Sequence, residues 1–316
     1  MTPIARSSIA VSGFALLLLL GTGMVAGGFP DPGAESGAYQ SVGGTPTAPD
    51  VSWTPQTPGE GRLFQIMVRA SATSPISGAL GQVAGEELHF ERMGGGLYQS
   101  LAAVPVGSEG VVAAELRVVY ESGTEETFTR EIPIAAGVYA HERLSVAPRF
   151  GTAPDSADQA QLARDQAMAR EVSRVSHRTP RAWGEAVVLP RNGQVTSSFG
   201  DGREFNGQIS SRHMGLDLQG TRGDTVVASA AGTVALVEPF LLAGNIVYLN
   251  HGGGLLSAYF HLSRQLVAVG DTVRAGDPIG LVGATGRVTG PHLHWVVRYG
   301  RTSVDPRSLL DVAGPG

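Results

Sequence analysis

The chain of 316 residues contains no cysteine. This absence excludes disulfide bridges, zinc sites made of thiolates, a cysteine nucleophile and lipoprotein-type acylation. Charged residues are also sparse, at 16% of the sequence, and the net charge is −5. Such a balance provides no basic surface for nucleic acid or for an anionic membrane, so we expect neither as a partner of the folded part of the chain.

Glycine and proline are abundant, with 44 and 19 residues. Together with the low charge, they favour a turn-rich, all-β protein over a helical one. Hydrophobic residues make up 42% of the sequence, which is ample for packed cores. The length corresponds to about two domains.

The first 29 residues have the pattern of a targeting segment. Arg6 precedes an apolar run over residues 9–20, and small residues follow from Gly21 to Gly28. A basic start, an apolar core and a small-residue exit are typical of a secretory signal peptide. The alternative is an uncleaved membrane anchor, because the weakly apolar run extends to Phe29 and is about long enough to span a bilayer. Both interpretations place the rest of the chain outside the cytoplasm, as a periplasmic, secreted or inner-membrane-anchored protein.

Residues 30–50 are rich in proline, glycine, serine and threonine and predict a flexible linker. Residues 51–147 contain short β-type runs between glycine-rich turns, a spacing that predicts a small sandwich of immunoglobulin type. The runs are 63–70, 86–93, 97–104, 111–120 and 126–134. No catalytic cluster is visible in this domain, and we interpret His89 and His141 as surface or strand residues.

A linker over residues 148–189 carries one predicted helix, 156–177, with a Ser-x-x-Gln capping box that begins at Ser156. This helix is too short for a long coiled coil. Residues 190–310 return to short β-type runs between glycines, which predicts a compact antiparallel β domain with an open groove. Residues 311–316 are expected to form a tail.

Residues 285–297 have the pattern of a Gly/Pro loop followed by an apolar, β-branched strand. Side chains alternate along a strand, so His292 and His294 are expected to point to the same face. Two imidazoles on one face of a rigid strand suit a metal site or a proton-transfer site. The pair alone is equally compatible with two hydrogen-bonded surface histidines.

Three residues upstream favour the metal site. His213 and Asp217 are four apart, an even spacing that keeps both on one face of an extended segment, and His261 ends an apolar run. A zinc hydrolase site typically takes three ligands from His, Asp or Glu and leaves a fourth position for water. A histidine, a nearby aspartate and a distant histidine supply such a set, and the remaining histidines could act as acid or base catalysts. His251 and Asn206 are interpreted as turn or loop residues rather than ligands.

At these residues the chain resembles the lysostaphin/LytM-type zinc endopeptidases, which cut the peptides of peptidoglycan. The resemblance covers residues 190–310 and rests on several motifs in a shared order and spacing. They are His-x-x-x-Asp at 213–217, Gly-Asn-x-Val at 244–247, Tyr-x-His-Leu-Ser at 259–263, Gly-Asp-x-Val-x-x-Gly-Asp at 270–277 and Thr-Gly-Pro-His-Leu-His at 289–294.

The resemblance implies a zinc site with one ion per chain. His213, Asp217 and His294 would be its ligands, and water would take the open position. His261 and His292 would flank that water without binding the metal. They would act as base, proton donor or stabiliser of the oxyanion.

One position departs from the pattern of the family. Many relatives carry an acidic residue two positions after the second histidine of the His-Leu-His motif, where this chain has Val296. The position is not a ligand in the family, so the difference does not exclude zinc. It leaves the outer partner of a ligand histidine unidentified, and such partners tune metal affinity.

We therefore expect a secreted zinc-dependent endopeptidase that hydrolyses peptide bonds in peptidoglycan stem peptides or cross-bridges. One alternative is a non-catalytic activator of cell-wall amidases, the role of degenerate family members that lack ligands. The complete ligand set and the absence of a long coiled coil oppose it. A second alternative is a zinc carboxypeptidase of the D-Ala-D-Ala type, which the sequence contexts of His261 and of the His-Leu-His motif oppose.

Overall fold

The computed structural model describes residues 48–184, 187–207 and 209–313. The predicted signal peptide or anchor, 1–29, and most of the predicted linker, 30–50, therefore lie outside the described residues. Within the described ranges, no helix is long and apolar enough to cross a membrane.

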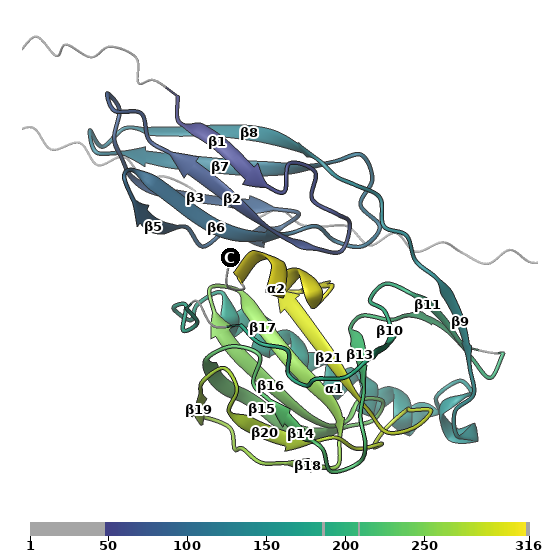
Figure 1. Ribbon diagram of the computed structural model, residues 1–316. Coiled ribbons are helices and arrows are strands. Elements are labelled where there is room, and N and C mark those ends of the chain that lie inside the picture. The colour runs from purple at the N-terminus through teal and green to yellow at the C-terminus, as the bar shows by residue number, and fades with distance from the viewer. Residues whose placement is uncertain (1–47, 185–186, 208, 314–316) are drawn as a thin grey trace, which may run out of the picture. The chain divides into compact units, whose positions relative to one another are not determined.

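The first β domain consists of two four-stranded antiparallel sheets, with the strand orders β1-β2-β6-β5 and β4-β3-β7-β8. Its strands are β1 (Asp50–Thr54), β2 (Leu63–Arg69), β3 (Ile76–Val83), β4 (Glu86–Glu87), β5 (Glu91–Gly94), β6 (Leu97–Ala103), β7 (Val111–Tyr120) and β8 (Glu125–Pro133). Apolar and polar side chains alternate along β7, so that Leu116, Val118 and Tyr120 are at most 3% exposed. Buried residues of both sheets form one core, which confirms the predicted β-sandwich (Figure 1).

A connecting segment leads from the sandwich to the second β domain. It contains β9 (His141–Leu144), the 3-10 turn η1 (Pro148–Phe150) and α1 (Ser156–Ser176). The helix is the predicted one, but its N-cap is Asp155 rather than Ser156, because the carboxylate of Asp155 accepts the backbone N–H of Asp158 at 2.8 Å. Val172 packs α1 onto the sheet of the second β domain.

The second β domain is organised around an antiparallel sheet with the strand order β10-β13-β21-β17-β16-β15-β19, to which β22 is added beside β21. These strands are β10 (Val195–Ser197), β13 (Leu216–Gln219), β15 (Gly232–Phe240), β16 (Gly244–Gly252), β17 (Leu255–Leu262), β19 (Thr272–Val273), β21 (His292–Tyr299) and β22 (Thr302–Val304). Two three-stranded sheets accompany it, in the orders β12-β11-β9 and β14-β20-β18. Their remaining strands are β11 (Gly202–Phe205), β12 (Ile209–Arg212), β14 (Thr225–Val227), β18 (Arg264–Gln265) and β20 (Pro278–Leu281).

Strand β21 lies between β13 and β17 and organises the side chains of this sheet. Leu293, Trp295 and Val297 are fully buried on one face. His292 and His294 alternate with them and are half-buried on the other face, as predicted. Because the apolar side chains on the opposite face of β21 are packed in the core, the strand holds the two histidines in a fixed position.

The two β domains share buried side chains. Leu63 of β2 belongs to the same apolar cluster as Leu309 of helix α2 (Arg307–Ala313), and Arg62 pairs with Asp305 at 3.0 Å. The helix includes the start of the segment that was predicted to be a tail. The sandwich and the second domain are thus parts of one compact unit.

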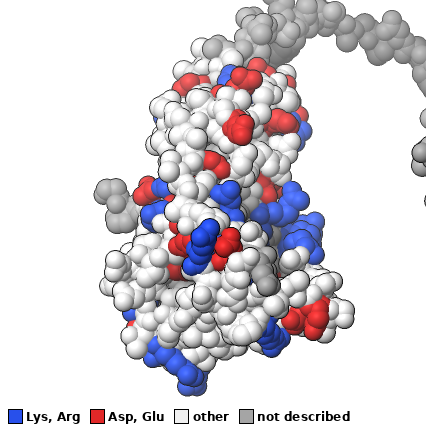
Figure 2. Space-filling view, turned by 90° about the vertical axis from the view of Figure 1, so that its right-hand side faces the viewer, with Lys and Arg blue, Asp and Glu red and all other residues white. Residues whose placement is uncertain are grey.

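The surface carries few charges. Because the sequence contains no lysine, every basic side chain in Figure 2 is an arginine. Arginine and acidic side chains are mixed on the face shown, among a largely uncharged surface (Figure 2). Recognition of a ligand therefore depends on local groups rather than on a long-range field of one sign.

Candidate metal centre and groove

The pairing of β13 with β21 brings the predicted ligands together. Asp217 lies opposite His294 in the register, and its Oδ1 is 2.8 Å from the Nδ1 of His294. The Nε2 of His213, just before β13, is 3.1 Å from that oxygen and 2.9 Å from that nitrogen. One ligand atom from each residue lies within 4.8 Å of the others. Two imidazoles and a carboxylate at this proximity form a donor set for a divalent transition metal.

The outer side of each predicted ligand histidine is fixed. The Nδ1–H of His213 donates to the backbone carbonyl of Ser198 at 2.7 Å, which leaves its Nε2 lone pair for a metal. The ring of His294 stacks on Phe260, with centroids 5.2 Å apart. It also lies over Gly215, where an added Cβ would come within 2.6 Å of the imidazole Cε1. Any side chain at Gly215 would therefore displace the ligand ring.

The charge states of this cluster suit a cation. Burial by itself raises the pKa of Asp217, but the hydrogen bonds with His213 and His294 outweigh it and hold that pKa well below its usual range. Burial lowers the pKa of His294 to about 4. At neutral pH the centre therefore presents a carboxylate and a neutral His294, the states in which these groups bind metals.

His261 and His292 lie beside the three predicted ligands, with ring centroids 5.0 Å apart. Each donates its Nδ1–H to a backbone carbonyl at 2.8 Å, His261 to Thr285 and His292 to Gly290. In the neutral form of each ring, Nε2 is therefore the unprotonated nitrogen, and the Nε2 of His292 is 3.6 Å from Oδ1 of Asp217. His261 has a φ of +61°, a strained backbone conformation that proteins retain mainly at functional sites.

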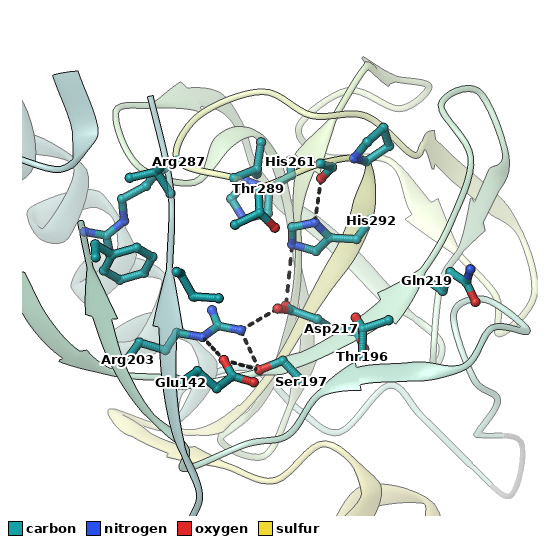
Figure 3. Close-up of a pocket in the computed structure, with 16 residues that line it drawn as sticks. Glu142, Thr196, Ser197, Arg203, Asp217, Gln219, His261, Arg287, Thr289 and His292 are labelled. Carbon is teal, nitrogen blue, oxygen red and sulfur yellow. Dashed lines mark hydrogen bonds and ion pairs between the residues drawn. The ribbon is translucent and has the colours of Figure 1, made fainter. Parts of the chain in front are cut away.

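A groove with a volume of about 240 Å³ passes over these residues. Figure 3 shows Asp217 and His292 near its centre, with Arg287 towards one end and Gln219 towards the other. Val146, which follows β9, also lines the groove. The connecting segment therefore forms part of the wall of the groove, which agrees with the predicted open groove but adds a contributor from outside the second domain.

A charged network next to Asp217 could not be predicted from the sequence. Arg203 on β11 donates from Nη2 to Oδ2 of Asp217 at 2.5 Å and from Nε to Glu142 at 3.0 Å (Figure 3). Ser197 hydrogen-bonds to both Arg203 and Glu142. Its hydroxyl accepts from Arg203 at 2.7 Å and donates to Glu142 at 3.0 Å. The polar loop around Arg203 was visible in the sequence, but Glu142 reaches it only because β9 pairs in parallel with β11.

Three residues outside the predicted ligand set have clear structural roles. His251 is not a hairpin-turn residue, since it is fully buried within β16. Asn206 holds the connecting segment, because its side chain accepts from the backbone N–H and donates to the carbonyl of Val146. Val296 is buried in the apolar cluster that contains Phe260. Apolar packing therefore occupies the position at which many relatives have an acidic residue.

The comparison with known families gives one match. The model of peptidase family M23 matches residues 211–306. This range contains the three converging residues and the two histidines beside them.

Two curated relatives are peptidoglycan DD-endopeptidases of Vibrio cholerae. ShyC is 36% identical over 118 residues, which make up 37% of this chain and 27% of ShyC. ShyA is 45% identical over 83 residues, which make up 26% of this chain and 19% of ShyA. The matching stretch therefore spans about a quarter or less of the length of these relatives.

One solved structure is similar over most of the chain. It is a candidate M23 peptidase from Pseudomonas aeruginosa, with a TM-score of 0.61 and 23% identity, over 80% of this chain and 95% of that one. At this identity the likeness shows a common fold.

Proposed function

We propose that this chain, whose residues 211–306 match the model of peptidase family M23, is a zinc-dependent endopeptidase that hydrolyses peptide bonds of peptidoglycan. The observation that carries the proposal is the convergence of His213, Asp217 and His294 beside two histidines with unprotonated Nε2 atoms. The names of ShyC and ShyA support peptidoglycan peptides as the substrate class.

His213, Asp217 and His294 would hold the zinc ion, because their nitrogen and oxygen donors fit its preference. When bound, zinc supplies Lewis acidity and lowers the pKa of coordinated water towards about 7. Arg203 binds Oδ2 of Asp217 and thereby keeps Oδ1 directed at the two ligand histidines. The protein thus orients its carboxylate ligand before the metal arrives.

The two remaining histidines handle protons. The Nε2 of His292 is the closer to the centre, so it accepts the proton of the attacking water and returns it to the leaving nitrogen. His261, with its Nδ1–H held by Thr285, accepts a hydrogen bond from the same water and orients it. Both tautomers are set by backbone carbonyls, so neither histidine needs to rearrange during the reaction.

This arrangement favours an enzyme over an amidase activator without catalysis. An activator requires a binding surface, but it has no use for two histidines held in the proton-accepting tautomer beside a complete ligand set. His261 and His292 are held in this way. No feature of the described groove specifically favours the carboxypeptidase alternative.

The decisive experiment compares His292→Ala with His294→Ala. His294→Ala removes one of three ligands, so zinc content and cleavage of purified peptidoglycan should fall together. His292→Ala leaves the ligand set whole, so zinc should stay near the wild-type level while turnover falls by about a hundredfold or more. Substrate affinity should change less than turnover, because the lost interaction belongs mainly to the transition state.

The exposed His141 provides the matched control, since it belongs to neither set. His141→Ala should keep both its zinc and its activity. Loss of the groove zinc in His292→Ala together with its retention in His294→Ala would mean that the two roles are exchanged. Mass analysis of the released fragments identifies the bond that is cut.

We also propose that the chain acts outside the cytoplasm, where peptidoglycan lies. Residues 1–29 support this location through their signal-like pattern. Cell fractionation with amino-terminal sequencing should find the chain outside the cytoplasm, either shortened near Gly28 or intact in the membrane fraction. Soluble cytoplasmic protein that still begins at Met1 would refute export.

A further inference from the structure

A second cluster of histidines lies outside the groove, where the sandwich meets the end of α1. His89, which the sequence suggested to be an ordinary surface or strand residue, is half-buried, and its Nε2 is 2.8 Å from the Nδ1 of His177. Glu87 lies beside them, so that one ligand atom from each of the three residues is within 4.8 Å of the others. This is the same class of donor set as in the groove, two imidazoles and one carboxylate.

His177 is oriented from behind by a buried carboxylate. Its Nε2–H donates to Oε2 of Glu86 at 3.1 Å, so its Nδ1 faces His89 as a lone pair. Glu86 is only 6% exposed, and Oε1 accepts the backbone N–H of Arg301 at 3.0 Å. A carboxylate that holds the far nitrogen of an imidazole is the arrangement that fixes metal-binding histidines in proteins.

The absence of a side chain at Gly300 leaves space for the contact between Glu86 and His177. Gly300 has a φ of +54°, and an added Cβ would come within 2.1 Å of Oε2 of Glu86 and 2.2 Å of Nε2 of His177. On the sandwich side, the hydroxyl of Ser100 accepts the backbone N–H of His89 at 2.9 Å. Both domains therefore shape the cluster, and a side chain at Gly300 would disrupt it.

The imidazoles are spaced like those of the groove. The facing nitrogens of His89 and His177 are 2.8 Å apart and their ring centroids 5.1 Å. For His213 and His294 the corresponding distances are 2.9 and 4.8 Å. An N–H···N hydrogen bond explains such a spacing without a metal. The additional carboxylates, one beside the pair and one behind it, distinguish this cluster from a simple histidine pair.

We propose that Glu87, His89 and His177 form a second site for a divalent transition metal, with zinc as the best match to the donors. Two ligands come from the sandwich and one from the C-cap of α1, so the bound ion fastens the sandwich to the helix. Glu87 and His177 border a surface cavity of about 500 Å³, which gives water access to the remaining coordination position. The role of the site is structural and does not depend on the proposed activity.

Arginines around the cavity oppose a cation, but two of them are already paired. Arg174 forms an ion pair with Glu171, and the Nε of Arg301 is 3.6 Å from Oε1 of Glu86. Glu87 adds a carboxylate directly at the proposed ligands. Charge at the ligand atoms therefore remains favourable for a divalent ion.

The test is the zinc content of the full chain in four forms, after loading with zinc and removal of free metal. The wild type should hold about two ions per chain, and His213→Ala and His89→Ala about one each. The double variant should hold none. Wild type and His89→Ala with one ion each, and His213→Ala with none, would overturn the second site while leaving the groove site in place. One ion in the wild type, one in His213→Ala and none in His89→Ala would support the second site and contradict the groove site.

Two further variants guard against loss of the fold as an explanation. Glu86→Gln keeps the size of the side chain but weakens the support of His177, and it should reduce zinc affinity by about 10–100-fold at this site alone. His141→Ala removes a histidine outside both clusters and should keep two ions. Addition of zinc to metal-free His213→Ala should raise its Tm, but the same addition should leave the Tm of the double variant unchanged. Equal responses in these two forms would overturn the proposal.

Discussion

His251 shows how strongly one buried residue can couple stability to pH. Its ring is fully buried in β16, its Nδ1–H donates to the carbonyl of Ala231 at 2.8 Å, and its Nε2 is 2.7 Å from the hydroxyl oxygen of Ser257. Burial lowers the pKa of this imidazole from 6.5 to about 4. The folded protein therefore keeps His251 neutral at pH values where the unfolded chain protonates it.

Between pH 6.5 and about 4, the unfolded state takes up a proton that the folded state does not bind. The free energy of unfolding should therefore fall as the pH decreases through this window, by about 3 kcal/mol from this residue alone. His251→Gln retains an N–H donor but cannot titrate, so its stability should fall less steeply over the same range. Urea unfolding of both proteins at several pH values measures the difference. Parallel curves would mean that His251 does not titrate as the burial implies.

The three residues that we propose as metal ligands were recognisable in the sequence, but the groups that orient them were not. His213 and Asp217 are four residues apart, and all three residues, His294 included, stand in recognisable motifs. The carbonyl of Ser198 that fixes His213 is a backbone atom, and a backbone atom leaves no sequence signal. Gly215 makes room for the ring of His294, a role that the sequence alone does not reveal. At the residue scale, the side chains suited to metal binding could thus be recognised in the sequence, whereas the groups that hold them in place could not.

At the scale of elements, the strands and helices with a regular pattern of apolar and polar residues were predicted well. β7 has the bounds given by its alternating sequence, and α1 differs from the predicted helix by one residue at its end. β3 was missed, because Gly78 and Gly81 interrupt its apolar pattern. The run 86–93 is divided between β4 and β5, since alternation alone does not reveal where pairing with a neighbouring strand stops.

The parallel pairing of β9 with β11 was beyond prediction for a different reason. The two strands are far apart in the sequence, and each has only four residues. No local period specifies such a contact between segments that are distant in the sequence. Glu142 lies on β9 and lines the groove, so its presence in the groove could not be predicted from the sequence either.

At the scale of the whole molecule, helix α2 joins the two β domains. The hydroxyl of Ser308 accepts the backbone N–H of Leu63 at 3.0 Å, and the amide of Gln65 donates to the carbonyl of Val312 at 2.8 Å. Leu309 is fully buried in the apolar cluster that also contains Leu63. Folding of β2 and docking of α2 therefore depend on each other, which predicts that the domains unfold together.

Leu309→Ala tests this coupling. Removing a fully buried leucine side chain should cost about 2–5 kcal/mol, and here the loss falls on the contact between α2 and the sandwich. The wild type should show a single calorimetric transition, and Leu309→Ala should show two, because the domains no longer stabilise each other. Leu249→Ala is the matched control, since Leu249 is equally buried but lies on β16, inside the second domain. It should lower the Tm and keep one transition. If Leu309→Ala also keeps one transition, with a shift like that of Leu249→Ala, the domains do not owe their joint unfolding to α2.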